Sequence, residues 1–132
     1  MHRSLAVAAG LAAALLTPAA PAAAAEPAVC HVDYRTYGDS WTFNGEIVIT
    51  NTGPFTLYGW TLKFTLPAGQ TFRNGWEADF KVEGQNVIGH SLEYNGEVKQ
   101  KGSVPVGFHA AGSVKGPRPA EFRINDYLCT TA

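Results

Sequence analysis

Two tryptophans lie in opposite sequence contexts, and only one of them is placed to meet a ligand. Trp60 alternates in phase with Leu62 and Phe64, which is the period-two pattern of a strand with one buried face. Trp76 follows a turn and has polar neighbours, so we expect it to be exposed. An exposed large aromatic ring marks a binding surface when other rings join it. Trp76 therefore predicts a binding surface whose other members come from elsewhere in the chain.

The first residues have the order of a secretory signal peptide. A short basic start precedes an apolar run over residues 5–16, and small residues follow up to Ala25. This order predicts a signal peptide over residues 1–25, cleavage after Ala25 and a secreted product. The apolar run is too short for a membrane anchor. Residues 26–132 are then long enough for a single domain with one core.

The charge of this domain excludes two classes of partner. Without the leader and its Arg3, nine Lys and Arg residues face eleven Asp and Glu residues, which gives a net charge near −2. The chain contains no run of basic residues. We therefore expect neither nucleic acid nor an anionic membrane as a partner, and we expect a monomer.

The two cysteines, Cys30 and Cys129, lie near the two ends of the predicted domain. In a secreted chain an even pair of cysteines indicates a disulfide. Such a bond requires the first and last strands to lie close together. Two thiols this far apart, without a CxxC motif, do not indicate a metal site.

Short alternating segments follow one another along the rest of the chain, separated by turn signals. The predicted strands are 30–37, 41–51, 58–66, 70–76, 78–83, 87–88, 103–109 and 121–128, the last with a turn at Asn125-Asp126. Asn95-Gly96 is a strong signal for a two-residue turn. No segment after the leader has the apolar spacing of a helix. The pattern predicts an all-β fold, either an antiparallel two-sheet β-sandwich or a small closed barrel.

The order of several short motifs resembles a family 2 carbohydrate-binding module, the cellulose-binding type found on bacterial glycoside hydrolases. The resemblance covers residues 29–130. The motifs that carry it are Cys30-His-Val-Asp-Tyr, Trp41, Ile49-Thr-Asn-Thr-Gly53, Gly59-Trp-Thr-Leu62, Leu66-Pro-Ala-Gly-Gln70, Trp76, Tyr94-Asn-Gly96, Val106-Gly-Phe108 and Cys129. The resemblance implies an Ig-like or jelly-roll-like β-sandwich, a disulfide between the terminal cysteines, and a flat binding face with three aromatic rings.

The resemblance assigns these three rings to Trp41, Trp76 and Tyr94. Tyr94 stands where the family usually has Trp. Trp41 matches less well, because only Thr42 separates it from Phe43, whereas the family has a longer spacing with a glycine before the Phe. Trp41 shares the strand parity of Phe43, so it would point into the core of a regular strand. It faces solvent only if a bulge or the start of the strand breaks that phase.

The rings would stack on the C–H faces of sugar rings and exclude water. Family sites also use amide side chains to bind sugar hydroxyls, and Asn74 lies two residues before Trp76, on the same face of its strand. Pro105 and His109 stand where the family often has Gln and Asn, and Glu46 stands where it has another amide. The predicted ligand is insoluble β-1,4-linked polysaccharide, with cellulose first and chitin second. Thr42, in place of the family's glycine, leaves xylan open, and an Ig-like domain that binds a protein through the aromatic face is a further alternative.

The sequence predicts no catalysis. A glycosidase needs two carboxylates that flank a cleft, and a small sandwich with a flat face offers no such cleft. We therefore expect the carboxylates near the face to be solvated surface charges; they are Glu77, Asp79, Glu93 and Glu97. A GxSxG motif is absent, and the histidines of the predicted domain do not have the spacing of metal ligands. We expect a binding module that uses no cofactor and no metal.

Overall fold

The computed structural model describes residue 10 and residues 27–132. The predicted signal peptide, residues 1–25, lies outside the described residues apart from Gly10. The described part of the chain contains twelve strands, β1 to β12, and no helix. It therefore holds no helical segment of the length and apolarity needed to cross a membrane. The all-β prediction is confirmed.

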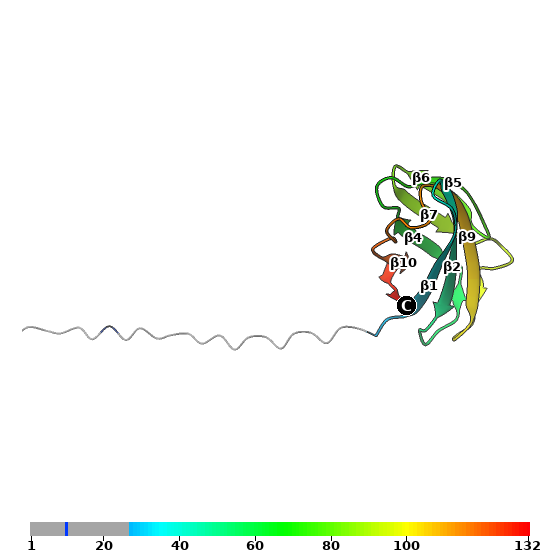
Figure 1. Ribbon diagram of the computed structural model, residues 1–132. Coiled ribbons are helices and arrows are strands. Elements are labelled where there is room, and N and C mark those ends of the chain that lie inside the picture. The colour runs from blue at the N-terminus through cyan, green and yellow to red at the C-terminus, as the bar shows by residue number, and fades with distance from the viewer. Residues whose placement is uncertain (1–9, 11–26) are drawn as a thin grey trace, which may run out of the picture.

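Two five-stranded sheets form the two layers seen in Figure 1. The first sheet has the order β12 (Thr130–Thr131), β1 (Cys30–Gly38), β2 (Thr42–Asn51), β9 (Ser103–Ala111) and β5 (Thr71–Trp76). The second sheet has the order β11 (Tyr127–Leu128), β10 (Phe122–Ile124), β4 (Thr61–Thr65), β7 (Asn86–His90) and β6 (Asp79–Glu83). A small third sheet pairs β3 (Leu57–Tyr58) with β8 (Glu97–Val98). The predicted sandwich is correct, and the closed barrel is not, because two separate sheets face each other.

Alternation along the strands of the first sheet divides their side chains between the core and the outer face. On β9, Val104, Val106 and Phe108 are buried, and Pro105 lies on the opposite face, as the sequence predicts. The ring of Phe108 lies over Gly45 on β2, where a Cβ atom would meet it at 2.3 Å. This glycine therefore makes room for the Phe108 ring, around which four buried or partly buried aromatic rings pack. They are Tyr34, Phe43, Phe64 and Phe72.

The predicted strand 58–66 is divided, which corrects the sequence-based prediction. The chain leaves β3 at Gly59, whose φ is +97°, a value that suits glycine. The backbone N–H groups of Gly59 and Trp60 then donate to the Gly96 carbonyl and the Ser91 hydroxyl. These contacts with a neighbouring loop replace the strand ladder, and β4 begins at Thr61. Trp60 itself is buried, as predicted.

The turn near Asn95 also differs from its prediction. Its backbone hydrogen bond runs from the Asn95 N–H to the Leu92 carbonyl, so the turn ends at Asn95 instead of centring on Asn95-Gly96. The flanking strands β7 and β8 belong to different sheets and do not pair. The Asn95 side chain accepts a hydrogen bond from the Leu92 N–H and so stabilises the loop. Local turn signals predict a reversal of the chain but do not say which strands it joins.

The predicted disulfide between Cys30 and Cys129 is present, with a Cα–Cα distance of 4.7 Å. Both cysteines are buried. The short strand β12 pairs in parallel with β1, with Thr130 opposite His31. Figure 1 shows the C-terminus beside the start of β1. The two ends of the domain are therefore held together, as the cysteine positions require.

Candidate functional site: an aromatic face on the first sheet

Trp76 ends β5 and lies across the outer face of the first sheet. Its register partner on β9 is Gly107, and a Cβ atom at that glycine would lie 2.2–2.4 Å from three atoms of the indole. Such a distance is far below van der Waals contact, so only glycine allows the ring to rest against the sheet. The side chain remains 42 % exposed. One face of the indole therefore packs on Gly107 and the other is free for a ligand.

A β-bulge turns Trp76 outward. Phe72, Asn74 and Trp76 have the same parity, and a regular strand would place all three on one face. The register with β9 shifts between Phe72 and Asn74, which leaves Arg73 as the extra residue. Phe72 consequently packs against the core, and Asn74 and Trp76 are exposed on the outer face. The prediction that Asn74 shares the face of Trp76 agrees with this arrangement.

Trp41 lies in the connection between β1 and β2 and is 82 % exposed. The Asp39 carboxylate accepts hydrogen bonds from the backbone N–H groups of Trp41 (2.7 Å) and Thr42 (3.0 Å). The bonds from Thr42 and Trp41 lower the pKa of Asp39, because they stabilise its charged form. Regular strand structure begins only at Thr42, so the parity that would bury Trp41 does not apply. The start of the strand, one of the two routes predicted for exposure, turns this ring outward.

Tyr94 is held beside Trp76 by the residue that follows Trp76. Its hydroxyl donates to the Glu77 carboxylate at 2.9 Å, and its side chain is 72 % exposed. Glu77 has a φ of 66°, unusual for a residue other than glycine. The side-chain amide of Asn95 donates a hydrogen bond to the backbone carbonyl of Glu77 at 2.7 Å. The backbone carbonyl of Asn95 accepts a hydrogen bond from the indole N–H of the buried Trp60. This chain of contacts ties the position of Tyr94 to the core.

We expected Glu77 to be a solvated surface charge, but its carboxylate accepts a hydrogen bond from the Tyr94 hydroxyl. The other three carboxylates of that prediction, Asp79, Glu93 and Glu97, are exposed as expected. The hydrogen bond with Glu77 raises the pKa of Tyr94, with smaller contributions from partial burial and from the charge of Glu77. The carboxylate stabilises the neutral phenol that donates to it.

We expect substitution of Glu77 to make Tyr94 ionise at lower pH. Glu77→Gln removes the charge but keeps an acceptor, and Glu77→Ala removes both, so the pKa of Tyr94 should fall further in the alanine variant. A pH titration followed by phenolate absorbance measures this shift, and Tyr94→Phe identifies the signal. Asp79→Asn, which changes an exposed carboxylate two residues along the chain, should leave the titration unchanged. An unaltered Tyr94 titration in Glu77→Ala would contradict the assigned contact.

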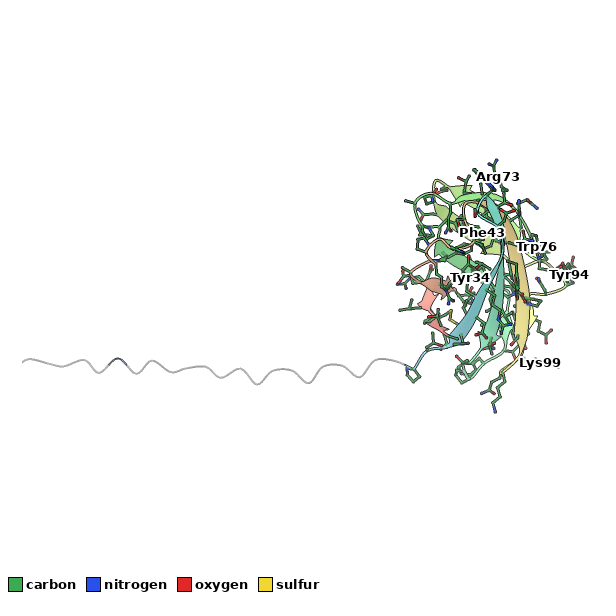
Figure 2. All side chains as sticks on the ribbon, viewed as in Figure 1. Tyr34, Phe43, Arg73, Trp76, Tyr94 and Lys99 are labelled. Atoms are coloured by element: carbon green, nitrogen blue, oxygen red, sulfur yellow. A yellow bond between two sulfur atoms is a disulfide. The ribbon has the colours of Figure 1, made fainter. Side chains whose placement is uncertain are left out.

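The contacts of Trp41, Trp76 and Tyr94 are spread along β9. The Trp41 carbonyl accepts a hydrogen bond from Gly112, Trp76 lies on Gly107, and Tyr94 borders a shallow hollow with Ser103 and Val104. With a rise of about 3.4 Å per residue, Trp76 is roughly 17 Å from the Trp41 end of β9 and roughly 10–14 Å from the Tyr94 end. Figure 2 shows Trp76 and Tyr94 on the side of the first sheet turned away from the second sheet. The structure thus places Trp76 and Tyr94 on one face, and it leaves Trp41 exposed at the far end of the same strand.

Polar side chains lie between the rings, and one of them was missed from the sequence. Asn44 on β2 and His109 on β9 are register partners, and the imidazole N–H of His109 donates to the Asn44 carbonyl oxygen at 2.7 Å. Asn74 on β5 faces His109 from the other side, and Glu46 on β2 is opposite Gly107. The alternation of Asn44 with the buried Phe43 was the signal that could have identified it.

This arrangement can bind a flat ligand. The rings offer stacking surfaces, and the polar side chains offer donors and acceptors for hydroxyl groups. Within residues 27–132, no three His, Cys, Asp or Glu side chains gather where they could hold a metal ion.

The comparisons with known proteins agree with this geometry. Residues 30–129 match the family described as "Cellulose binding domain". Exoglucanase B of Cellulomonas fimi is 36 % identical over 101 residues, which is 76 % of this chain and 9 % of that protein. The chain spans about a tenth of that enzyme and 14 % of Exoglucanase A from the same organism.

Two solved structures share the fold. The chitin-binding domain of Chi18aC from Streptomyces coelicolor has a TM-score of 0.62 at 24 % identity, covering 76 % of this chain and 93 % of that domain. The cellulose-binding family 2 carbohydrate binding domain from ScLPMO10C has a TM-score of 0.56 at 23 % identity, covering 80 % of this chain and 99 % of that domain. The family match, which extends from Cys30 to Cys129, confirms the resemblance seen in the sequence motifs. The chain belongs to the cellulose binding domain family.

Proposed function

We propose that this chain is a non-catalytic module that binds insoluble β-1,4-linked polysaccharide, cellulose or chitin, through Trp41, Trp76 and Tyr94, with Asn74 assisting. The observation that carries the proposal is that Trp76 and Tyr94 are exposed on one face of the first sheet, with the exposed Trp41 at the far end of β9 from Tyr94. An extended polysaccharide chain is the kind of ligand that such an arrangement fits. We expect the module to bind as a monomer and without a cofactor.

The energetics favour several rings and a rigid ligand. Removing apolar surface from water contributes about 25 cal/mol per Å², so one stacked ring gives a few kcal/mol before the cost of association. That cost includes lost translational freedom and the ordering of flexible groups. A polysaccharide chain within an ordered solid is already rigid, so less of the stacking energy is lost. Three rings in line are then sufficient for useful affinity.

Two observations support cellulose or chitin over xylan. Trp76 packs against the sheet at Gly107, so its free face looks away from the sheet, as a flat ligand surface requires. Among the similar proteins, one is an exoglucanase and another is a chitin-binding domain. Cellulose and chitin are both β-1,4-linked chains that form ordered solids, and one aromatic face can serve either of them.

The expected location is extracellular. The predicted signal peptide would release a domain of residues 26–132, and the buried Cys30–Cys129 disulfide suits an oxidising compartment. An insoluble polysaccharide is also a ligand that is met outside the cell.

A pull-down of residues 26–132 on microcrystalline cellulose, chitin and insoluble xylan tests the proposal. We expect the protein to sediment with cellulose, chitin or both, and to stay in solution with xylan. Sedimentation with xylan alone would support the xylan-binding alternative instead. If none of the three solids retains the folded protein, the proposed function is wrong, and a protein partner on the aromatic face becomes the hypothesis to test.

A further inference from the structure

A fourth exposed aromatic side chain lies on the same face but outside the line of rings. Tyr37 on β1 is 56 % exposed. Its register partner is Asn44 on β2, which is the partner of His109 on β9, which in turn is opposite Asn74 on β5. Tyr37 therefore belongs to a row that crosses the outer face of the first sheet. Tyr37 was not among the site residues predicted from the sequence.

The position of this row separates Tyr37 from the other three rings. His109 lies between Gly107, beneath Trp76, and Gly112, which contacts Trp41. Along the strands, Tyr37 is thus level with the gap between these two rings. Across the sheet it is two strands from β9, or about 10 Å at a strand spacing of about 4.8 Å. A single polysaccharide chain lying on the line of rings passes beside Tyr37 and does not stack on it.

A polar side chain accompanies Tyr37 on the outer face of β1. Arg35 is exposed two residues away and is opposite Glu46 on β2. Its guanidinium carries five N–H donors, which suit the hydroxyl and ring oxygens of a sugar. Asn44 and His109, which lie between Tyr37 and the line of rings, bind each other. The outer face of β1 thus offers its own stacking ring and its own donors.

We propose that Tyr37 and Arg35 form a second binding track, which contacts a polysaccharide chain lying beside the one that occupies Trp41, Trp76 and Tyr94. The proposal rests on the proposed function and adds that the module recognises a surface of adjacent chains. The track is continuous with the aromatic face, since its row ends at Asn74. Side-by-side chains exist in an ordered solid but not around a dissolved oligosaccharide. Tyr37 therefore acts in binding to the solid only.

The test compares binding to crystalline cellulose or chitin with binding to the matching soluble hexasaccharide. We expect Tyr37→Ala to weaken binding to the solid about tenfold, as for one significant aromatic contact, and to leave binding to the hexasaccharide unchanged. Trp76→Ala should weaken both. Tyr127→Ala is a matched control, because Tyr127 is also 56 % exposed but lies on β11 of the second sheet. It should change neither.

Each other outcome contradicts the second track. If Tyr37→Ala weakened binding to the solid and to the hexasaccharide equally, Tyr37 would contact the same polysaccharide chain as the other rings. If it weakened neither, Tyr37 would take no part in binding. The result separates this inference from the proposed function. If the wild-type protein binds the solid and Trp76→Ala abolishes that binding, the function stands whatever Tyr37→Ala does. If the wild-type protein binds neither ligand, both proposals are wrong.

Discussion

Trp76→Ala should weaken binding to cellulose or chitin by about 2 kcal/mol or more, roughly thirtyfold, because an aromatic side chain at the centre of an interface commonly dominates its energy. Trp76 is the middle ring of the line, between Trp41 and Tyr94. Its indole already rests on Gly107, so little conformational freedom is lost when a ligand covers the other face. Depletion isotherms on the two solids measure the change.

The fold should survive this substitution, since the side chain lies on the outer face and not in the core. Thermal unfolding and far-ultraviolet circular dichroism check that it does. Phe55→Ala is a suitable control, because Phe55 is an aromatic residue 79 % exposed between β2 and β3, outside the first sheet. It should bind as the wild type does. A folded Trp76→Ala protein with undiminished binding would show that the aromatic face is not the site.

Gly107→Ala gives an independent test of the same geometry with Trp76 still present. The added Cβ would lie 2.2 Å from the indole, so the ring has to lift away from the sheet. We expect binding to weaken even though no ring is removed. Gly107 thus acts as a positioning residue for Trp76. Gly107→Ala tests whether binding depends on the orientation of the indole, whereas Trp76→Ala tests only whether it depends on the presence of the ring.

The strands of the first sheet could be predicted because each alternates between a buried and a solvated face. Val104, Val106 and Phe108 on β9 show the pattern clearly, and the structure buries all three. Trp60 was identified as a core residue by the same rule, although the strand around it is divided. Hydrophobic alternation is local, so it survives in a single sequence without knowledge of which strands pair.

The details of the site could not be predicted in the same way, because they depend on partners distant in sequence. The bulge at Arg73 appears only in the register between β5 and β9. The contact of Trp76 with Gly107 and that of Tyr94 with Glu77 join separate elements. Tyr37 was overlooked because nothing local shows that its row crosses the sheet to Asn74. Motif order gave the prediction of the rings, and strand pairing determines how Trp76 lies.

Replacing both cysteines, as Cys30→Ala with Cys129→Ala, should cost the domain much of its stability. The bond joins residues 99 apart in sequence, so it closes a loop of nearly the whole domain. The chain-entropy model gives about 4.7 kcal/mol for a loop of about 100 residues, as a stabilisation that comes from constraining the unfolded chain. For a domain of this size, each kcal/mol corresponds to about 4–8 °C in Tm, so we expect a fall of roughly 20–40 °C.

Thermal unfolding followed by tryptophan fluorescence measures this fall, and reduction of the wild-type protein should reproduce it. The agreement matters because the two experiments disturb the native state differently: the variant removes two buried sulfur atoms, and reduction keeps them. A fall in the variant alone would assign the loss to packing around the cysteines, and a fall in neither would contradict a role of the bond in stability.

Below its lowered Tm, the protein without the disulfide should still bind the polysaccharide. The bond lies beside β12, whose pairing with β1 starts at His31, whereas Trp76 lies at the opposite edge of the same sheet, on β5. Loss of the bond therefore frees the β12 end of the sheet and leaves the pairing of β5 with β9, on which the aromatic face depends.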